Sequence, residues 1–498
     1  MLLPVSLFAL VQSFVLLAEA QQQQLALDTV RDFNSSSLPS PPTFFISPSS
    51  DFRHVSVGLC ASSAGAPRFF VSNDSSITHP GPDNVDGKSV IEISVGPEGY
   101  GSFAGFFPRG GFFAIQAGSV NTPFEILLSA ANSTNPLSPF ASETTANQAI
   151  VFSPSFDPLD PLEPSYPNYT LPSANLTQGN APSPPKNYTL VYVPTANSPL
   201  ASVLRTNCAI RSAAQQSNSG AKILSSNSAT LWLRDDQGWR WEWFLGGSEG
   251  GLTPKTNYTM YTLQDGTIAA SKPVMFLTKS ASFACALVHQ LPYCPAVAYA
   301  VPLAVPRPPQ VAYTASTLPS PVGETIVSGM SNFTSTLTTL ACGRDDYSPL
   351  VTCADCQAAY RTWLCTVSFP RCGESNPTSP TPPGASPSTA LLGGSSAQQV
   401  LLPAVPALKT VNASAAARNP ALPAFGEAYE VLLPCLEVCN AADRACPVFL
   451  GFKCPLPAFT ASDSYAVGYV DSGREGEVGG GATGGAWDEF GNVWCNGP

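Results

Sequence analysis

The stretch "CADCQAAYRTWLCTVSFPRC", residues 353–372, places four cysteines on one predicted helix and on the residues that follow it. Thr352 can cap this helix, and Asp355 lies in its first turn, where a negative charge is favoured. Cys356 and Cys365 are nine positions apart, about 900° of rotation, so they face opposite sides of the helix. We therefore expect them to bond to different neighbours, and the nature of those bonds decides the class of the protein.

Metal binding, redox chemistry and crosslinking require different surroundings for such cysteines. A zinc site needs two close pairs of ligands, but "CADC" is a single pair, and the three histidines, His54, His79 and His289, are scattered. A redox pair needs a βαβ setting, which the neighbouring proline-rich loops do not offer. The fourteen cysteines are an even number concentrated in the C-terminal half, which is typical of a disulfide framework in an oxidising compartment.

Structural disulfides are thus the favoured interpretation, and redox or metal roles are the alternatives left open. The sequence does not fix the pairing, although Cys60 and Cys208 are a possible pair because the other cysteines all follow them. In "PCLEVCNAADRACP" a second helix is predicted to begin near Pro434, since proline suits a first helical turn. The candidate disulfide cysteines are Cys60, Cys208, Cys285, Cys294, Cys342, Cys353, Cys356, Cys365, Cys372, Cys435, Cys439, Cys446, Cys454 and Cys495.

Two further patterns predict the secretory pathway. Residues 1–20, "MLLPVSLFALVQSFVLLAEA", are almost wholly apolar and end in a small-x-small site typical of a signal peptide. A retained anchor is the alternative, because no Lys or Arg precedes Arg31. Residues 21–49 are predicted to be disordered. Nine Asn-x-Ser/Thr sequons predict a glycosylated exterior. They are headed by Asn34, Asn73, Asn132, Asn168, Asn175, Asn187, Asn257, Asn332 and Asn412.

Composition excludes several other classes of protein. The 498 residues include 23 Lys plus Arg and 34 Asp plus Glu, without the basic stripe that nucleic-acid binding requires. Clustered oxygen ligands of the kind that calcium needs are also missing, so we expect neither a metal nor a cofactor. After the signal segment no run of eighteen apolar residues occurs, and no GPI signal is recognised. We therefore expect a protein that is soluble or held at the membrane by a partner.

The order of the predicted elements indicates an α+β chain. Residues 50–284 contain short strands separated by Gly, Pro and Asn, which predicts an antiparallel β-sandwich-like, glycosylated domain. A proline-rich loop interrupts it at about 153–186. Residues 285–498 are predicted to form a disulfide-rich, mainly helical domain, with a disordered insertion at about 374–424. The prediction is thus two domains of different character.

A tryptophan-rich segment, "LWLRDDQGWRWEWF", lies in the predicted sandwich. Its centre suits a hairpin turn, and Trp239, Trp241 and Trp243 alternate with charged residues, so they should share one face of a strand. A place in the sandwich core is favoured over a carbohydrate-binding platform.

The motifs that could indicate catalysis lack the context that catalysis requires. "GGSEG" around Ser248 is followed by a turn and a strand, whereas a nucleophile elbow needs a helix. "GGGATGG" at 479–485 precedes neither a helix nor a suitably spaced acid. Asp235 and Asp236 are adjacent and make a poor glycosidase pair, and His289 has no evident acid or nucleophile beside it in the sequence. We predict that the chain is not an enzyme.

Four ordered motifs resemble one known family. They are "LVHQLPYCPAVAYAVP" (287–302), "CADCQAAYRTWLCTVSFPRC" (353–372), "LLPCLEVCNAADRACPVFLGFKCP" (432–455) and the terminal "WCNGP". Together they look like the fungal stretch-activated calcium-channel regulatory family of the mating-pheromone-induced-death type. The resemblance covers about residues 285–498. The cysteine-rich region of that family is similar to the frizzled-type cysteine-rich fold, so the resemblance implies a frizzled-like domain here.

The resemblance also implies a function. It implies an extracellular glycoprotein that docks, as an auxiliary subunit, on a pore-forming, four-repeat, voltage-gated-type calcium-channel subunit and supports calcium influx during mating or stress. It implies the extracellular face of the plasma membrane and the endoplasmic reticulum as locations, with membrane association through the partner. Docking is expected on apolar and aromatic residues of a fixed scaffold, although core packing is the favoured fate of each candidate. The candidate interface residues are Trp363, Phe369, Phe449, Phe452 and Trp494.

A second function stays open beside the channel subunit. A frizzled-like domain could instead belong to a secreted glycoprotein that binds a lipid or another ligand. That alternative predicts an apolar groove between the helices of the cysteine-rich domain.

Overall fold

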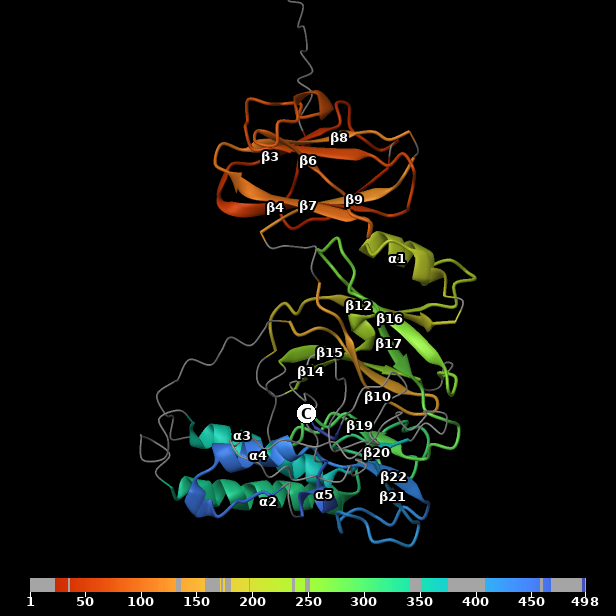
Figure 1. The fold of residues 1–498 in the computed structure, drawn as a ribbon, viewed down its shortest axis with the longest axis vertical. Helices are drawn as coiled ribbons and strands as arrows, with labels where there is room; N and C mark the ends of the chain where they lie inside the picture. Colours follow the sequence, from red (N-terminus) through yellow and green to blue (C-terminus); the bar gives the residue numbers. More distant parts are fainter. Residues whose placement is uncertain are drawn as a thin grey trace, which may run out of the picture. The chain divides into compact units, whose positions relative to one another are not determined.

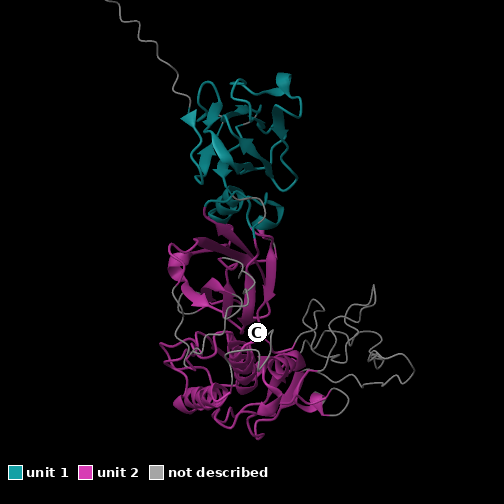
Figure 2. Cartoon of the chain, turned by 90° about the vertical axis from the view of Figure 1, so that its left-hand side faces the viewer, with its two compact units in different colours: residues 1–136, 199–216, 266–270 teal, residues 137–198, 217–265, 271–498 magenta. Residues whose placement is uncertain are grey.

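The computed structural model divides the chain into two compact units (Figure 2). Unit 1 comprises residues 1–136, 199–216 and 266–270, and unit 2 comprises residues 137–198, 217–265 and 271–498. The chain therefore leaves unit 1 and returns to it twice. The residues that the structure describes are 23–34, 36–119, 121–130, 136–156, 171, 173–174, 181–196, 198–234, 238–246, 251–340, 351–374, 408–456, 460–466 and 495–497.

Strands dominate both units. Unit 1 contains β1 (Gln23–Gln24), β2 (Arg31–Phe33), β3 (Thr43–Ile46), β4 (Ser49–Leu59), β5 (Arg68–Ser72), β6 (Val90–Ile93), β7 (Tyr100–Phe107), β8 (Gly111–Gln116), β9 (Phe124–Ser129) and helix α1 (Asn207–Ala214). Unit 2 begins with β10 (Phe140–Thr144), β11 (Ala149–Phe152), β12 (Tyr188–Pro194), β13 (Lys222–Ser225), β14 (Thr230–Leu233), β15 (Trp239–Leu245), β16 (Asn257–Gln264) and β17 (Val274–Leu277). It continues with β18 (Ala286–Val288), β19 (Tyr299–Val301), α2 (Ser320–Thr338), α3 (Cys353–Ser368), β20 (Arg371–Gly373), β21 (Leu408–Val411), β22 (Tyr429–Leu432), α4 (Leu436–Ala445) and α5 (Ala461–Ser464).

Unit 1 is a sandwich of two sheets (Figure 1). One sheet has the strand order β1-β3-β8-β5-β6 and the other β2-β9-β4-β7, and every pair except β1–β3 is antiparallel. Phe44 pairs with Phe113 in the first sheet, and Val57 pairs with Ile126 in the second. All four side chains are fully buried in one core. Apolar residues thus alternate along each strand, and their side chains fill the space between the two sheets.

The first strands of unit 1 differ from the sequence prediction. Residues 21–49 were expected to be disordered, but their described part contains β1, β2 and β3. Phe44 and Ile46 on β3 are completely buried in the core. The segment is too short and too rich in Ser and Pro to show strand periodicity, and its order comes from pairing with the distant strands β8 and β9.

Unit 2 starts with a second sandwich. Its sheets have the orders β10-β11-β15-β14 and β13-β12-β16-β17, and all of their pairs are antiparallel. β14 and β15 form the predicted hairpin, with Leu233 opposite Trp239. Trp243 is fully buried in the core between the sheets, and Trp239 and Trp241 are half-buried and pack against the same core. The core interpretation of the tryptophans is confirmed. The predicted single domain over 50–284 is therefore two separate sandwiches.

The described part of residues 285–498 is less helical than predicted. Helix α3 packs against both α2 and α4, as Figure 1 shows at the base of unit 2. Five short strands accompany the helices, as the hairpin β18–β19 and the sheet β20-β22-β21. The structure thus adds short strands to the predicted helices, and the label "mainly helical" is not confirmed. Local periodicity could not predict the second sheet, because its strands lie far apart in the sequence.

Several predicted segments lie wholly or partly outside the described residues. They include the signal segment 1–20 and most of the proline-rich loop at 153–186. The insertion predicted at 374–424 is described from residue 408 onward, and there it contains strand β21 rather than disorder. Among the helices that the structure describes, none combines the length and the apolar character needed to cross a membrane.

Candidate functional site: the disulfide-bonded helices and their junction with the sandwich

Disulfide bonds organise the region around α3 and α4. The α3 group consists of Cys285–Cys372 and Cys294–Cys365, and the α4 group consists of Cys435–Cys495 and Cys439–Cys454. Cys356–Cys446 joins α3 to the end of α4, and among the described bonds it alone connects the two groups. In unit 1, Cys60 is bonded to Cys208. Cys353 is also disulfide-bonded, none of the described cysteines is free, and Cys342 lies outside the described residues.

Helix α3 begins as its sequence predicts. The Thr352 side chain accepts a hydrogen bond from the Asp355 N–H, and the Asp355 carboxylate accepts one from the Thr352 N–H at 2.7 Å, which completes a capping box. Cys356 and Cys365 leave opposite sides of the helix, toward Cys446 and Cys294. The prediction that they bond to different neighbours is confirmed.

Part of the buried face of α3 is polar. Gln357 and Arg361 are buried, whereas Tyr360, Trp363 and Leu364 are half-buried. Gln357 Nε2 donates to Thr334 Oγ1 of α2 at 2.8 Å. Hydrogen bonding to a neighbouring helix lets a polar side chain be buried, and this partner is not visible in the local sequence.

Aromatic side chains form a cluster where α2, α3 and the end of α4 meet. The Trp363 and Phe452 rings meet edge to face at 4.9 Å, and Tyr360 lies 6.1 Å from Phe452. Phe333 of α2 stacks on Tyr360. Trp363 Nε1 donates to the Tyr465 hydroxyl at 2.8 Å. Two of the predicted interface residues, Trp363 and Phe452, are thus brought together in one half-buried cluster.

The loop at 446–456 extends this cluster into solvent. Val448, Phe449 and Leu456 expose 73%, 64% and 61% of their surface. The loop is held near both ends, because Cys446 is bonded to α3 and Cys454 to α4. The disulfide bonds hold the loop in one conformation while its apolar side chains stay exposed to solvent. This loop is therefore the best candidate for a contact surface with another protein.

The other predicted interface residues are not part of this surface. Phe369 is completely buried in a core that also contains Tyr299 and Cys294. Phe369 is thus a core residue, as the sequence analysis favoured for each candidate. Trp494 lies outside the described residues.

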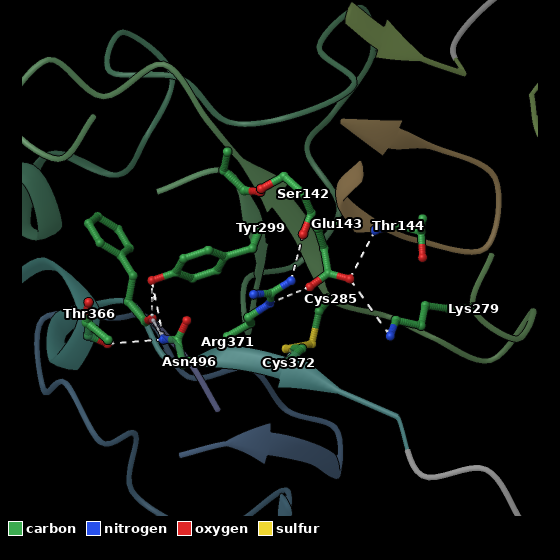
Figure 3. Close-up of polar contacts among 12 residues, drawn as sticks. Ser142, Glu143, Thr144, Lys279, Cys285, Tyr299, Thr366, Arg371, Cys372 and Asn496 are labelled. Atoms are coloured by element: carbon green, nitrogen blue, oxygen red, sulfur yellow. Dashed lines mark hydrogen bonds and ion pairs between the residues drawn. A yellow bond between two sulfur atoms is a disulfide. The ribbon is translucent and has the colours of Figure 1, made fainter. Parts of the chain in front are cut away.

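A buried ion cluster joins the second sandwich to the α3 group (Figure 3). Arg371 of β20 donates from Nε to Glu143 Oε2 at 2.7 Å and from Nη2 to the Ser142 carbonyl at 2.6 Å. Lys279 Nζ lies 3.8 Å from Glu143 Oε1, and the Thr144 N–H donates to the same oxygen at 3.0 Å. Burial by itself would raise the pKa of Glu143, but Arg371 and Lys279 outweigh burial and lower it.

A second set of polar contacts holds Asn496 against the C-terminal end of α3 (Figure 3). Asn496 is fully buried, and its Nδ2 donates to the carbonyls of Thr366 and Phe369 at 3.3 and 3.4 Å. The Tyr299 hydroxyl donates to the same Phe369 carbonyl at 3.0 Å. Burial raises the pKa of Tyr299 to about 12, so its hydroxyl remains a donor. These bonds satisfy the carbonyls at the end of α3.

A buried acid accompanies His289, which the sequence did not reveal. His289 Nδ1 lies 2.5 Å from Glu242 Oε1, and Gln290 Nε2 donates to that oxygen at 3.0 Å. The Phe244 ring stacks on His289. Glu242 lies on β15, which is 47 residues from His289 in the chain, so only tertiary structure brings them together. Both side chains are buried among packed neighbours, which makes this contact part of the junction between sandwich and hairpin.

The described residues do not assemble a metal site. Among them, the group of potential ligands with suitable spacing is Cys435, Glu437 and Cys495. Cys435 and Cys495 are bonded to each other, and thiolates rather than disulfide sulfurs bind metals. Ser248, Asp235, Asp236 and the glycine tract at 479–485 lie outside the described residues.

The sequons differ in how far their asparagines are exposed. Asn73, Asn187, Asn332 and Asn412 are exposed, and Asn34 and Asn257 are half-buried. Asn132, Asn168 and Asn175 lie outside the described residues. Glycosylation of the nine sites therefore stays a prediction.

These features define a sheet-rich, disulfide-crosslinked protein whose junctions are fixed and whose 446–456 loop presents apolar side chains. Residues 60–480 match the Mid1 family, which is described as a stretch-activated Ca²⁺-permeable channel component. The chain belongs to this family. The resemblance carried by the four cysteine-containing motifs is thereby confirmed.

Three curated relatives have related names. Stretch-activated cation channel MID1 of Cryptococcus neoformans var. grubii is 36% identical over 381 residues, which cover 72% of this chain and 59% of that protein. Stretch-activated cation channel yam8 of Schizosaccharomyces pombe is 30% identical over 224 residues, which cover 43% and 39%. Stretch-activated cation channel MID1 of Saccharomyces cerevisiae is 29% identical over 222 residues, which cover 41% and 34%. The matches thus span from 34% to 59% of the relatives' lengths.

A solved structure of two fibronectin type III domains from chicken tenascin shows a likeness without close superposition. It covers 48% of this chain and 97% of its own length at 12% identity, with a TM-score of 0.15. A score this low carries no argument about the fold, which rests on the strand pairing itself.

Proposed function

We propose that this chain is an extracellular auxiliary subunit of a fungal calcium channel, and that it docks on a separate pore-forming subunit of the four-repeat, voltage-gated type. The family description and the names of the three relatives support a role in a stretch-activated cation channel. The observation that carries the docking is the 446–456 loop, where exposed Val448, Phe449 and Leu456 are held by disulfide bonds at Cys446 and Cys454.

The physical case for docking is preorganisation. A flexible loop loses conformational freedom when it binds, at a cost of about 0.5–1.5 kcal/mol for each immobilised side chain. The 446–456 loop has lost much of that freedom already, because its disulfide bonds lead to both α3 and α4. Phe452 of the loop also packs against the rings of Tyr360 and Trp363 on α3, which further restricts the loop. Binding can then bury Phe449 at little entropic cost.

The location follows from the same proposal. Disulfide bonds persist in the secretory pathway and at the cell surface, and the described sequons with exposed asparagines can carry glycans. We place the chain at the extracellular face of the plasma membrane and in the endoplasmic reticulum, with membrane association through the pore-forming partner. In this role the chain performs no catalysis.

The alternative, a frizzled-like ligand-binding protein, receives less support. It requires an apolar groove beside the helices. The cavity between α3 and the residues around Cys294 has a volume of about 10 Å³, which is room for at most one water molecule. A larger opening of about 360 Å³ lies elsewhere, at the turn around Asn147 and near Phe283. This cavity beside α3 is therefore too small for an acyl chain.

Phe449→Asp is expected to reduce recovery of the pore-forming subunit from fungal membranes by about tenfold or more, with a matching loss of calcium uptake. A charge in the centre of a contact surface must be buried unpaired. Stability should change by less than about 0.5 kcal/mol, since Phe449 is exposed and has no described ring partner.

The matched control is Phe106→Asp. Phe106 exposes 55% of its surface on β7 of unit 1, against 64% for Phe449, and its ring lies 4.9 Å from that of Phe52. The same change is thus made at another exposed phenylalanine outside the cysteine-rich region. Recovery and uptake should stay at the wild-type level. Equal behaviour of the two variants would show that the 446–456 loop is not the docking surface.

A further inference from the structure

A buried carboxyl group lies between a sheet and a helix of unit 1. Glu125 is on β9, where Phe124 and Ile126 point into the sandwich core, so its side chain leaves the opposite face of the sheet. Glu125 is nevertheless only 5% exposed. Helix α1 lies on this side of the sheet (Figure 1), fixed by the Cys60–Cys208 bond and by a 2.7 Å hydrogen bond from Thr206 Oγ1 to the Leu59 carbonyl.

The partner of this carboxyl group is another carboxyl group. Asp32 of β2 stands directly opposite Glu125 in the strand register, and its exposed carboxyl group is near enough to raise the pKa of Glu125. Two ionised carboxylates have no proton to donate, so these two side chains can hydrogen-bond to each other only when one of them is protonated. The backbone N–H of Cys208 in α1 favours the ionised form of Glu125 and lowers its pKa. Glu125 Oε2 is buried and has no hydrogen-bond partner, so the site does not satisfy a full negative charge.

Among the other described residues near Glu125, one carries a positive charge that could balance an ionised carboxylate. Arg211 is the charged residue of α1, and it acts on Glu125. On β4 the residues facing the same way are Gly58 and Ser56, and the titratable His54 stands farther along, opposite Ser129. Residues 266–270, which also belong to unit 1, carry no charged side chain.

The ligand of this pair is a proton rather than a metal ion. Calcium takes about six to eight oxygen ligands, whereas this site offers two carboxyl groups beside an arginine. Burial, aided by the charge of Asp32, raises the pKa of Glu125 to about 8, although Arg211 and the Cys208 N–H act in the opposite direction.

We propose that Asp32 and Glu125 form a proton-dependent latch, which holds β2 on the sheet while Glu125 is protonated. When the proton passes to a base in solution, both carboxylates are negative and repel each other. Strand β2 joins this sheet only through β9, so it is the element that the repulsion loosens. The Cys60–Cys208 bond keeps α1 attached at its first turn.

The direction of the pH dependence follows from the raised pKa. A group with a higher pKa in the folded state than in the unfolded state stabilises the fold at low pH. For Glu125 that stabilisation is complete below its unfolded value of about 4.5. It is lost as the pH rises through about 8.

Hydrogen–deuterium exchange of the full-length chain between pH 6 and 9.5, corrected for the intrinsic pH dependence of exchange, tests the latch. In the wild type, protection of Arg31–Phe33 should fall around pH 8, while protection of α1 and β16 stays unchanged. Glu125→Gln should abolish the transition. Asp32→Asn, which removes a negative neighbour, should move its midpoint to lower pH, and Arg211→Gln should move it to higher pH, each by about one unit.

The midpoints of Asp32→Asn and Arg211→Gln should shift in opposite directions, so these two variants test the latch even if Glu125→Gln does not fold. Constant protection across this pH range in the wild type would overturn the proposal. So would an unchanged midpoint in both Asp32→Asn and Arg211→Gln, or a transition that Glu125→Gln retains.

Discussion

Replacing Cys356 and Cys446 together by alanine is expected to lower the free energy of unfolding of unit 2 by about 4–5 kcal/mol. The bond spans 90 residues, and the entropy of the unfolded chain rises most when a long loop is opened. The other described bonds do not replace it, because none of them connects the α3 group to the α4 group. We expect α4 and the 446–456 loop to detach from α3 before the rest of the unit unfolds.

The matched control removes the bond between Cys439 and Cys454, which spans only 15 residues. Its loss should cost about 3 kcal/mol and should leave α3 and α4 crosslinked. Urea unfolding of both double variants, followed by tryptophan fluorescence, measures the difference. Equal losses in the two variants, or a larger loss for Cys439→Ala with Cys454→Ala, would contradict the role assigned to the longer loop.

Arg371→Met is expected to destabilise unit 2 by about 3–5 kcal/mol, the usual cost of leaving a buried charge without its partner. Glu143 would keep only Lys279, at 3.8 Å, and the Thr144 N–H. The effect should appear in urea unfolding of the full chain, with circular dichroism and fluorescence as readouts.

The double variant Glu143→Met with Arg371→Met is the informative control. Replacing both members of a buried ion pair by apolar side chains is often neutral or stabilising, so the double variant should be more stable than Arg371→Met alone. The wild type should also lose stability as the pH falls below about 4.5 through the lowered pKa of Glu143. Additive effects of the two substitutions would show that the pair is not coupled.

Local sequence rules predicted the structure well where the determinants are close in the chain. The capping of α3 by Thr352 and Asp355 and the opposite directions of Cys356 and Cys365 follow from helix geometry. The shared face of the tryptophans on β15 follows from strand alternation. Each of these features depends on residues within one element, and each is present in the structure.

Features that depend on distant residues could not be predicted in the same way. Arg371 meets Glu143 across 228 positions, and nothing in the neighbourhood of either residue indicates the other. The sequence shows no acid beside His289, and tertiary packing brings Glu242 to it. The division into two sandwiches was missed for the same reason, because the segments at 199–216 and 266–270 return to unit 1.

The candidate contact surface falls between these two cases. The sequence selected Trp363, Phe449 and Phe452 by residue type alone, and the structure places Trp363 and Phe452 in one cluster and Phe449 on the adjoining loop. It also selected Phe369, which is buried in the core. What distinguishes Phe449 from Phe369 is solvent exposure, which depends on the neighbours that cover each side chain after folding.

The amount of pore-forming subunit that co-purifies with this chain from fungal membranes tests the account most directly. The chain lacking Cys356–Cys446 is compared with the chain lacking Cys439–Cys454 and with the wild type. We predict that the wild type and the Cys439–Cys454 variant retain the large ion-conducting protein, and that the Cys356–Cys446 variant loses most of it. Recovery of no such protein by the wild type, or full recovery by the Cys356–Cys446 variant, would contradict a docking role for the crosslinked helices.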